Sequence, residues 1–417
     1  MRIYIYVFLI AAAVTYLTTP FVRRMARRIG AITPVRDRDV HVVPIPRLGG
    51  LAMFLGFAAA LLVASRTEFL GRLFVGGEPW GVLLGALVVV LLGVADDVWD
   101  LDAITKLAGQ ALAAGLMAWK GVQLVFLPIF GVTIPSFGTL FVLTVLIIVV
   151  TINAVNFVDG LDGLAAGILG IAGTAFFSYT YLLAKDQLPN VPEASRSYAF
   201  ASLASLITAA MVGCCVGFLP HNFNPARVFM GDSGSMLLGL LLASSTVTIT
   251  GVDPGAVRLA APAFFPLVIP LAVLAVPLID LGMAVVRRTR AGLKPWHPDK
   301  SHLHHRLLRL GHSHARAVLL IYLWTAIAAF GVALMAFVPV LTALAAGAGA
   351  IIVALGITLG PLRGRPGSAA VATGNHGSTV TEWTGQQSPE HSPIGQPSHP
   401  SQPSPPSRAP QQSGHAR

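Results

Sequence analysis

The chain has 417 residues, of which 54% are hydrophobic and only 11% are charged, and its formal net charge is +10. A soluble domain carries roughly 25% charged residues, so this composition excludes the soluble classes and indicates a membrane protein with many spans. The excess positive charge lies in two short loops, which reports on topology and does not indicate a nucleic-acid partner. Cys214 and Cys215 are adjacent in an apolar stretch, and we interpret them as packing residues.

Apolar segments close to the roughly 20 residues needed to cross a bilayer recur along the chain. The predicted segments are 3–21, 48–65, 80–95, 104–119, 137–155, 163–184, 198–219, 233–250, 259–285, 315–338 and 340–360. We therefore predict an all-α polytopic membrane protein with about 11 transmembrane helices. The first segment lacks the basic region and cleavage site of a signal peptide, so we expect it to remain as the first span.

Two arginine-rich loops orient these segments. One follows the first segment, from Arg23 to Arg47, and the other follows the ninth, from Arg287 to Arg309. Because cytoplasmic loops carry an excess of Lys and Arg, both loops are predicted to be cytoplasmic. The N-terminus is then outside and the C-terminus cytoplasmic.

Three stretches depart from this regular pattern. Prolines interrupt segment 259–285, which fits either a tolerated kink or a substrate groove. Residues 122–135 alternate apolar residues around a glycine and predict a small external β-hairpin. Residues 1–363 form the predicted transmembrane domain, whereas 364–417 are rich in Pro, Ser, Gln and His and predict a disordered cytoplasmic tail.

The first acidic cluster, Asp96 and Asp97, ends the third segment. Carboxylates at membrane depth are costly and usually functional. Adjacent carboxylates on a helix point about 100° apart, so one can bind a metal while its neighbour meets a second substrate or acts as a base. Asp100 and Asp102, further along, fit a solvated helix end instead.

The second cluster joins the fifth and sixth segments in the sequence Asn153-Ala-Val-Asn156-Phe-Val-Asp159-Gly-Leu-Asp162-Gly163. Asp159 and Asp162 are three residues apart and would share a face if helical. Asn153 and Asn156 offer amides suited to reading a base or an N-acetyl group. A turn with a helix cap is the alternative, but the junction of two apolar segments favours function.

The third cluster centres on Asp232, which begins the eighth segment just before Ser233 and Ser235. This aspartate could cap the helix, or it could hold Mg²⁺, which prefers one or two carboxylates together with phosphates and water. The glycines beside the amides that start the helix also favour phosphate binding.

The fourth cluster lies in the second basic loop, and its candidate residues are Lys300, His302, His304, His305 and Arg306. The three histidines resemble a zinc patch, but the chain lacks the Cys partners of most structural zinc sites, and the neighbouring cations would repel a metal. Recognition of phosphate or pyrophosphate fits the mixture better. A generic positive loop explains the arginines but not the imidazoles.

These clusters occur in the order seen in polyprenyl-phosphate N-acetylhexosamine-1-phosphate transferases, which the chain resembles over residues 1–360. One branch of this superfamily transfers phospho-N-acetylmuramoyl-pentapeptide. The other transfers N-acetylglucosamine-1-phosphate, and its last cytoplasmic loop reads His-x-His-His, as residues 302–305 do here. The stretch His41-Val-Val-Pro-Ile-Pro-Arg47-Leu-Gly-Gly50 also resembles the first loop of the second branch, which we therefore favour.

The resemblance implies UDP-N-acetylglucosamine as donor, undecaprenyl or decaprenyl phosphate as acceptor, and Mg²⁺ or Mn²⁺ as cofactor. UMP would be released in a reaction of the EC 2.7.8 class that begins cell-wall, teichoic acid, arabinogalactan or lipopolysaccharide synthesis. The enzyme would be a multi-pass protein of the plasma (inner) membrane with its active site on the cytoplasmic face. Relatives are often dimers, so a homodimer is compatible with the resemblance.

The resemblance also implies roles for individual residues. Asp97 and Asp232 would hold the metal, and Asp96 would deprotonate or orient the lipid phosphate. Asp159 and Asp162 would shape the nucleotide-sugar pocket. The remaining expected substrate-binding residues are Asn153, Asn156, Asn222, Arg47, Lys300, His302, His304, His305 and Arg306. Both a direct displacement and a covalent aspartyl-phosphate route remain open.

Two rival functions can be separated from this one. The muropeptide branch has the same chemistry with a larger donor, and an assay with both donors distinguishes the two. An ion-coupled transporter would place its ionisable residues near the bilayer midplane and often shows internal repeats. Here the acidic residues lie at segment ends, and the two halves of the chain share no motif.

Overall fold

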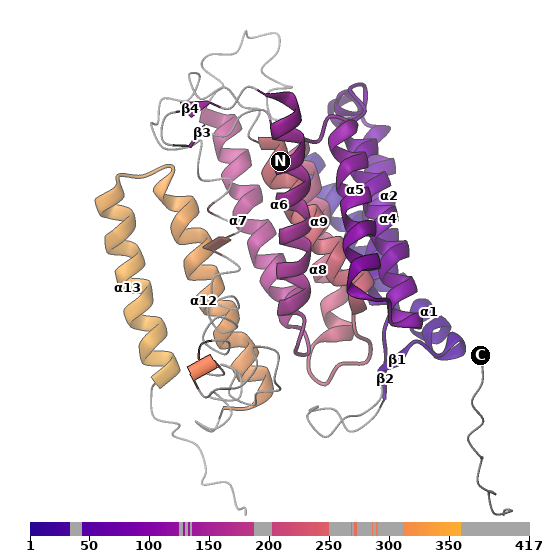
Figure 1. Cartoon of the computed structure of the whole chain (residues 1–417). Coiled ribbons are helices and arrows are strands. Elements are labelled where there is room, and N and C mark those ends of the chain that lie inside the picture. Colours follow the sequence, from indigo (N-terminus) through magenta and orange to yellow (C-terminus); the bar gives the residue numbers. More distant parts are fainter. Residues whose placement is uncertain are drawn as a thin grey trace, which may run out of the picture. The chain divides into compact units, whose positions relative to one another are not determined.

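The computed structural model describes residues 1–33, 44–124, 128–129, 132–133, 136–186, 202–249 and 312–359, together with isolated positions between 268 and 290. Almost every described residue is helical. The helices are α1 (Arg2–Ile29), α2 (Gly49–Ser65), α3 (Glu68–Gly71), α4 (Glu78–Trp99), α5 (Ala103–Trp119), α6 (Phe137–Val158), α7 (Leu164–Asp186), α8 (Leu203–Asn222), α9 (Gly231–Ile249), α12 (His314–Met335) and α13 (Val340–Leu359) (Figure 1).

Within the described part of the chain, eight helices are long and apolar enough to cross a membrane, or nine if the pair formed by α2 and Glu68–Phe74, bent by 92°, counts as one span. Each predicted segment except the ninth coincides with a helix. The all-α polytopic class is therefore confirmed. The ninth segment, 259–285, lies outside the described residues apart from three positions, and so do its prolines.

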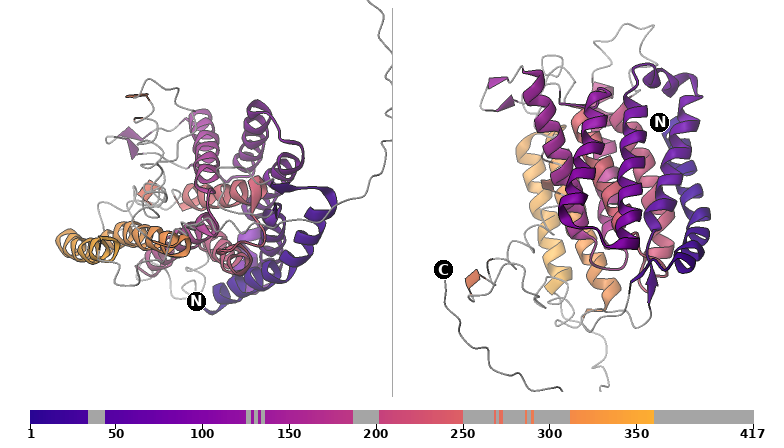
Figure 2. Two further views of the ribbon diagram at one scale, coloured as in Figure 1. Left: turned by 90° about the horizontal axis from the view of Figure 1, so that it is seen from below. Right: turned by 45° about the vertical axis from the view of Figure 1, so that its right-hand side comes forward.

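Helix α9 forms the centre of the bundle and packs against α2, α4, α6 and α8. In its most apolar stretch 89% of the residues are buried, compared with 11% in α13, which contacts the other helices through α12 (Figures 1 and 2). Peripheral helices such as α1 and α13 keep large apolar side chains exposed, as expected of surfaces that face lipid. Cys214 and Cys215 are free and buried, in agreement with a packing role.

The first turn of α9 lies very close to two neighbouring helices because glycines face it. A Cβ added to Gly93 of α4 would lie 2.3 Å from the Cα of Ser233, and one added to Gly50 of α2 would lie 2.1 Å from the amide nitrogen of Gly234. Both contacts are with backbone atoms, which cannot move aside as a flexible side chain can. The sequence therefore fixes the approach of α2 and α4 to the helix that carries Asp232.

Two short antiparallel strand pairs complete the fold. Strand β3 (Pro128–Ile129) pairs with β4 (Val132–Thr133), inside the stretch where the sequence predicts a hairpin. Strand β1 (Ile32–Thr33) pairs with β2 (Ile45–Pro46). The β2 strand and the start of α2 also bind the loop before α9: the amide of Phe229 donates to the carbonyl of Pro46 at 2.8 Å, and that of Gly49 donates to Phe229 at 2.9 Å.

Candidate active site

Asp96 and Asp97 occupy the last turn of α4, and both are buried. Asp97 faces α9. Its Oδ1 accepts from the amide of Asp232 at 3.0 Å, and its Oδ2 accepts from the amide and the hydroxyl of Ser233 at 3.3 and 3.0 Å. The first amides of a helix lack partners within the helix, and a negative charge is favourable there. Asp97 thus caps α9 from another helix.

This cap depends on a glycine and alters one expectation from the sequence. Gly231 has φ +69°, and a Cβ there would lie 2.3 Å from Oδ2 of Asp97. Only glycine fits both the backbone conformation and the space. The glycines beside the start of α9 predicted phosphate binding at its first amides, but the amides of Asp232 and Ser233 are already used by Asp97.

Asp96 faces α5 and shares a lysine with Asp232. The Nζ of Lys106 lies 2.7 Å from Oδ2 of Asp96 and 3.3 Å from Oδ2 of Asp232. The other oxygen of Asp96 accepts from the amide of Leu101 at 2.8 Å. The two carboxylates are close enough to interact directly, so a positive charge between them is needed to offset their repulsion.

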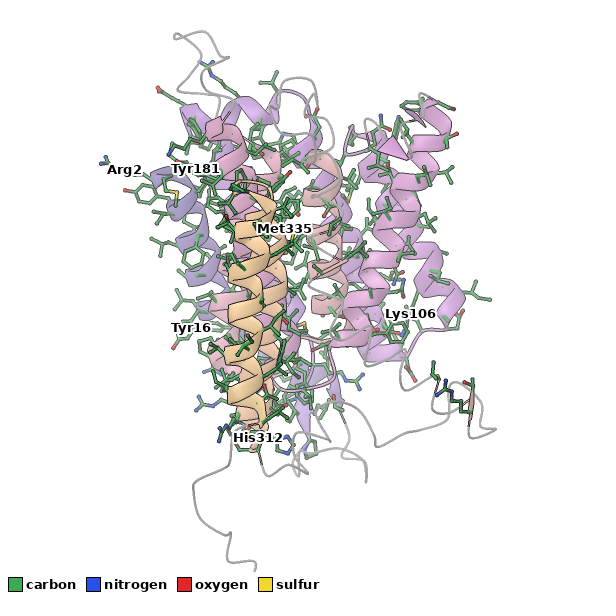
Figure 3. All side chains as sticks on the ribbon, turned by 90° about the vertical axis from the view of Figure 1, so that its left-hand side faces the viewer. Arg2, Tyr16, Lys106, Tyr181, His312 and Met335 are labelled. Atoms are coloured by element: carbon green, nitrogen blue, oxygen red, sulfur yellow. The ribbon has the colours of Figure 1, made fainter. Side chains whose placement is uncertain are left out.

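Sequence analysis missed Lys106 (labelled in Figure 3). A signal was present, because Lys106 is the one charged residue inside the predicted segment 104–119, directly after an acidic cluster. A cation in an apolar segment pairs with a partner as a rule. The acidic partner Asp232, however, is 126 residues away in the chain, so only the structure identifies it.

Two side-chain amides on α6 face the same region. The Nδ2 of Asn156 donates to the Oγ of Ser235 at 3.0 Å, one turn from Asp232 on α9. Asn153, one turn earlier on α6, donates from Nδ2 to the Oε1 of Gln110 on α5 at 2.6 Å. Both predicted asparagines therefore lie between α6 and the two helices that carry Lys106 and Asp232.

Asp159 and Asp162 lie in the turn between α6 and α7, where they do not share a helix face. Asp159 is the C-cap of α6. The Oδ2 of Asp162 accepts from Asn224 Nδ2 and from the amide of Ala226, each at 3.0 Å. Asp162 thereby binds the loop that leads into α9, and Gly163 adopts the positive φ of +77° that the turn requires.

Asn222 connects the same two loops from inside. Its Oδ1 accepts from the amide of Gly163 at 3.1 Å, and its Nδ2 donates to the carbonyl of Val228 at 3.0 Å. The side chain is buried, and both of its ends are used. Tyr322 of α12 adds a hydrogen bond to the carbonyl of Gly163. Asn222 therefore supports the site in these contacts, and the substrate-binding role that the resemblance implies for it stays a prediction.

The carboxyl of Asp159 interacts electrostatically with those of Asp232 and Asp97. Burial raises its pKa to about 7, and the negative charges of Asp232 and Asp97 act in the same direction. The positive charge of Arg47 opposes them. Arg47 itself donates from Nε to the Oγ1 of Thr33 at 2.6 Å, which holds it beside the β1–β2 pair.

The structure thus brings three of the five predicted catalytic carboxylates, Asp96, Asp97 and Asp232, to the start of α9. Asp159 interacts with Asp97 and Asp232 through charge, while Asp162 supports the loop beside them. The predicted histidine loop cannot be added to this picture. Its residues Lys300, His302, His304, His305 and Arg306 lie outside the described part of the chain.

The described carboxylates fit a divalent cation of the magnesium type. Among the described residues no group of three or more His, Cys, Asp or Glu side chains could hold a metal ion. Mg²⁺, however, usually takes one or two carboxylates and completes its shell with substrate phosphates and water. Asp96 and Asp232 already converge on one cation, the ammonium group of Lys106. Two carboxylates that converge on one cation are compatible with such a site.

The helices and the carboxylates around Lys106 are those of a polytopic membrane protein with a buried acidic site. Residues 79–250, which include α4, α5, α6 and α9, match glycosyl transferase family 4. A decaprenyl-phosphate N-acetylglucosaminephosphotransferase of Mycolicibacterium smegmatis is 45% identical over 369 residues, 85% of this chain and 87% of the relative. One of the same name from Mycobacterium tuberculosis is 44% identical over 363 residues, 85% of this chain and 88% of the relative.

A more distant relative, a probable undecaprenyl-phosphate N-acetylglucosaminyl 1-phosphate transferase of Bacillus subtilis, is 33% identical and covers 76% of this chain and 80% of its own length. The chain belongs to the polyprenyl-phosphate N-acetylglucosamine-1-phosphate transferases of glycosyl transferase family 4. The branch predicted from the sequence is confirmed.

Proposed function

We propose that the protein transfers N-acetylglucosamine-1-phosphate from UDP-N-acetylglucosamine to decaprenyl or undecaprenyl phosphate and releases UMP. The observation that carries this proposal is the match to transferases of this name over nearly the whole chain. The convergence of Asp96, Asp232 and Lys106 supports it, because the chemistry needs a charged site for two phosphates. The muropeptide alternative has no comparable support.

In this reaction an oxygen of the lipid phosphate forms a bond to the β-phosphorus of the donor, and the bond from that phosphorus to the oxygen of UMP breaks. Both reactants are anions, so the site must supply positive charge and align them. Lys106 balances one of the two negative charges of Asp96 and Asp232, and a divalent cation held there would supply positive charge for the substrates. Asp97 keeps Asp232 in place by fixing the first turn of α9.

We propose Asp96 and Asp232 as the residues that hold Mg²⁺, which when bound would neutralise charge on the transferring phosphates. The sequence favoured Asp97 with Asp232. In the structure Asp97 already accepts three hydrogen bonds from α9, so Asp96 is the more available partner. Asp97 then acts as a positioning residue.

The substrates would meet at the cytoplasmic face of the plasma membrane. This placement is supported by the positive-inside rule, because the arginine-rich end of α1 leads into the β1–β2 pair beside the site. The lipid would feed a cell-wall or surface polysaccharide. A homodimer remains a prediction from the resemblance.

The test is transfer of radiolabelled sugar-1-phosphate by the detergent-purified protein. Reactions contain polyprenyl phosphate, Mg²⁺ and either UDP-N-acetylglucosamine or the UDP-muramoyl-pentapeptide, with Asp232→Asn as the inactive control. Labelled lipid from the first donor alone is expected. Labelled lipid from the second donor alone would assign the protein to the peptidoglycan branch, and no product from either would reject the proposed substrates.

A further inference from the structure

Three arginines and a histidine gather away from the carboxylates, where the arginine-rich end of α1 meets the end of α8 and the loop that follows it. The cluster consists of Arg23, Arg27, His221 and Arg227. The positive charge of Arg23 is repelled by the charges of Arg27 and Arg227. The charges of Arg227 and Arg23 also act on the imidazole of His221. We call this group the arginine cluster.

Specific contacts hold the cluster together. The amide of Arg227 donates to the carbonyl of His221 at 2.9 Å, which folds the loop back on the end of α8. The Nε2 of His221 lies 3.2 Å from the carbonyl oxygen of Tyr16, and the two rings are 4.9 Å apart. Positive charges from two separate segments are therefore brought to one place by the fold.

Among the residues that the structure describes, no acidic side chain offsets this charge. The ion pairs found among the described residues are those of Lys106, and none involves the arginine cluster. The Nε of Arg23 is buried and has no hydrogen-bond partner. A buried polar group without a partner is costly, and more so when it is charged. The positive-inside rule accounts for exposed arginines such as Arg24 and Arg28, but not for a buried donor facing like charges.

The position of the cluster indicates the source of the missing anion. Tyr16, Leu17 and Phe21 are exposed apolar residues on α1, and the guanidinium of Arg24 lies over the ring of Phe21 at 5.5 Å. The cluster thus begins where the exposed apolar surface of α1 ends, and the positive-inside rule places this end of α1 at the phospholipid headgroups of the inner leaflet. In Figure 3, Tyr16 and Lys106 lie at opposite edges of the bundle, so the cluster is separate from the carboxylate site.

We propose that the arginine cluster binds the phosphate headgroup of an anionic phospholipid, whose acyl chains lie along the exposed face of α1. Guanidinium groups bind phosphate oxygens through paired hydrogen bonds, and basic pockets between membrane helices are suited to anionic headgroups. The phosphate would accept from the accessible guanidinium nitrogens of Arg23 and Arg227 and would reduce the repulsion between the two residues.

The test measures thermal unfolding of the full-length protein in neutral detergent while phosphatidylglycerol is added. Phosphatidylcholine serves as the uncharged lipid. A ligand that binds the folded state raises the unfolding temperature, so the titration gives an apparent affinity. The variant Arg23→Gln/Arg227→Gln removes two charges from the cluster. Its matched control, Arg66→Gln/Arg316→Gln, removes two exposed charges that do not lie on α1. If the double variant does not fold, Arg227→Gln alone takes its place, because Arg227 is exposed and its replacement should preserve folding.

Phosphatidylglycerol is expected to stabilise the unchanged protein and the control variant more than phosphatidylcholine does. Its apparent affinity for the cluster variant is expected to be at least about tenfold lower than for the unchanged protein. Equal weakening in both variants, or in neither, would overturn the proposal. Inorganic pyrophosphate and UMP are titrated in parallel. If these soluble anions, and not the lipid, depend on the cluster, the site belongs to the nucleotide substrate and the phospholipid proposal is rejected.

Discussion

Lys106 holds the position that a metal ion would share, so its replacement separates two effects. In Lys106→Gln, Asp96 and Asp232 lose the cation between them, and Mg²⁺ no longer competes with an ammonium group. We expect the transfer rate to fall about 100-fold, as for other charge-stabilising groups, while the apparent affinity for Mg²⁺ rises. Steady-state rates and the Mg²⁺ dependence of thermal unfolding measure the two effects. Lys106→Arg keeps the positive charge and tests whether that charge is required for transfer. An unchanged Mg²⁺ midpoint in Lys106→Gln would show that Lys106 and Mg²⁺ do not compete for the same carboxylates.

The carboxyl of Asp159 should make the protein less stable as the pH rises. Its pKa is about 7 in the folded protein, above its ordinary value of 3.8. Between these values the folded state retains a proton that the unfolded state has lost, so the contribution of Asp159 to stability falls from pH 4 to pH 7. Asp159→Asn removes this dependence, and its unfolding temperature relative to the unchanged protein should rise from pH 5 to pH 8.

The matched control for this titration is Asp102→Asn. Asp102 is the exposed N-cap of α5, and its pKa is lowered by hydrogen bonds from the hydroxyl of Thr105 at 2.6 Å and from the amides of Thr105 and Ile104 at 3.0 Å. A lowered pKa gives stability that is complete above the unfolded value and is lost only in acid. Its variant should therefore differ from the unchanged protein by a constant amount over pH 5–8. A constant difference for Asp159→Asn as well would show that this carboxyl does not titrate near neutrality.

At the scale of elements, the approach of α4 to α9 depends on the missing side chain at Gly93. Gly93→Ala would place a Cβ 2.3 Å from the Cα of Ser233, so α9 must shift together with Asp232. Overpacking costs about 1–3 kcal/mol, and a contact with backbone lies at the upper end of that range. We expect a lower unfolding temperature and little transfer activity. Gly347→Ala on α13, where nothing lies within 4 Å, should be neutral or stabilising, and equal behaviour of the two variants would contradict this account.

The helices were largely predictable because apolar length is a local property of the sequence, but their ends were less so. The predicted third segment stops at residue 95, before the first charge, whereas α4 continues to Trp99 and carries Asp96 and Asp97 within its last turn. Hydrogen bonding continues past the point where hydropathy falls. The clusters themselves were found because charge at a membrane edge is costly. The cap of α9 by Asp97 and the pairing of Lys106 with Asp232 join residues more than 100 apart, and no local pattern encodes them.

At the scale of the whole molecule, the orientation in the membrane follows from charge and can be tested with single cysteines. Cys214 and Cys215 are buried, so an impermeant maleimide should give little background labelling. Val75, in the loop before α4, is 89% exposed, and Arg28 is exposed in the last turn of α1, at the opposite end of the bundle. The positive-inside rule places Arg28 in the cytoplasm. Val75→Cys should therefore be labelled in intact cells and Arg28→Cys only in inverted vesicles. The reverse pattern would put the carboxylates and Lys106 outside, where no UDP-sugar is made, and would reject the proposed reaction together with the orientation.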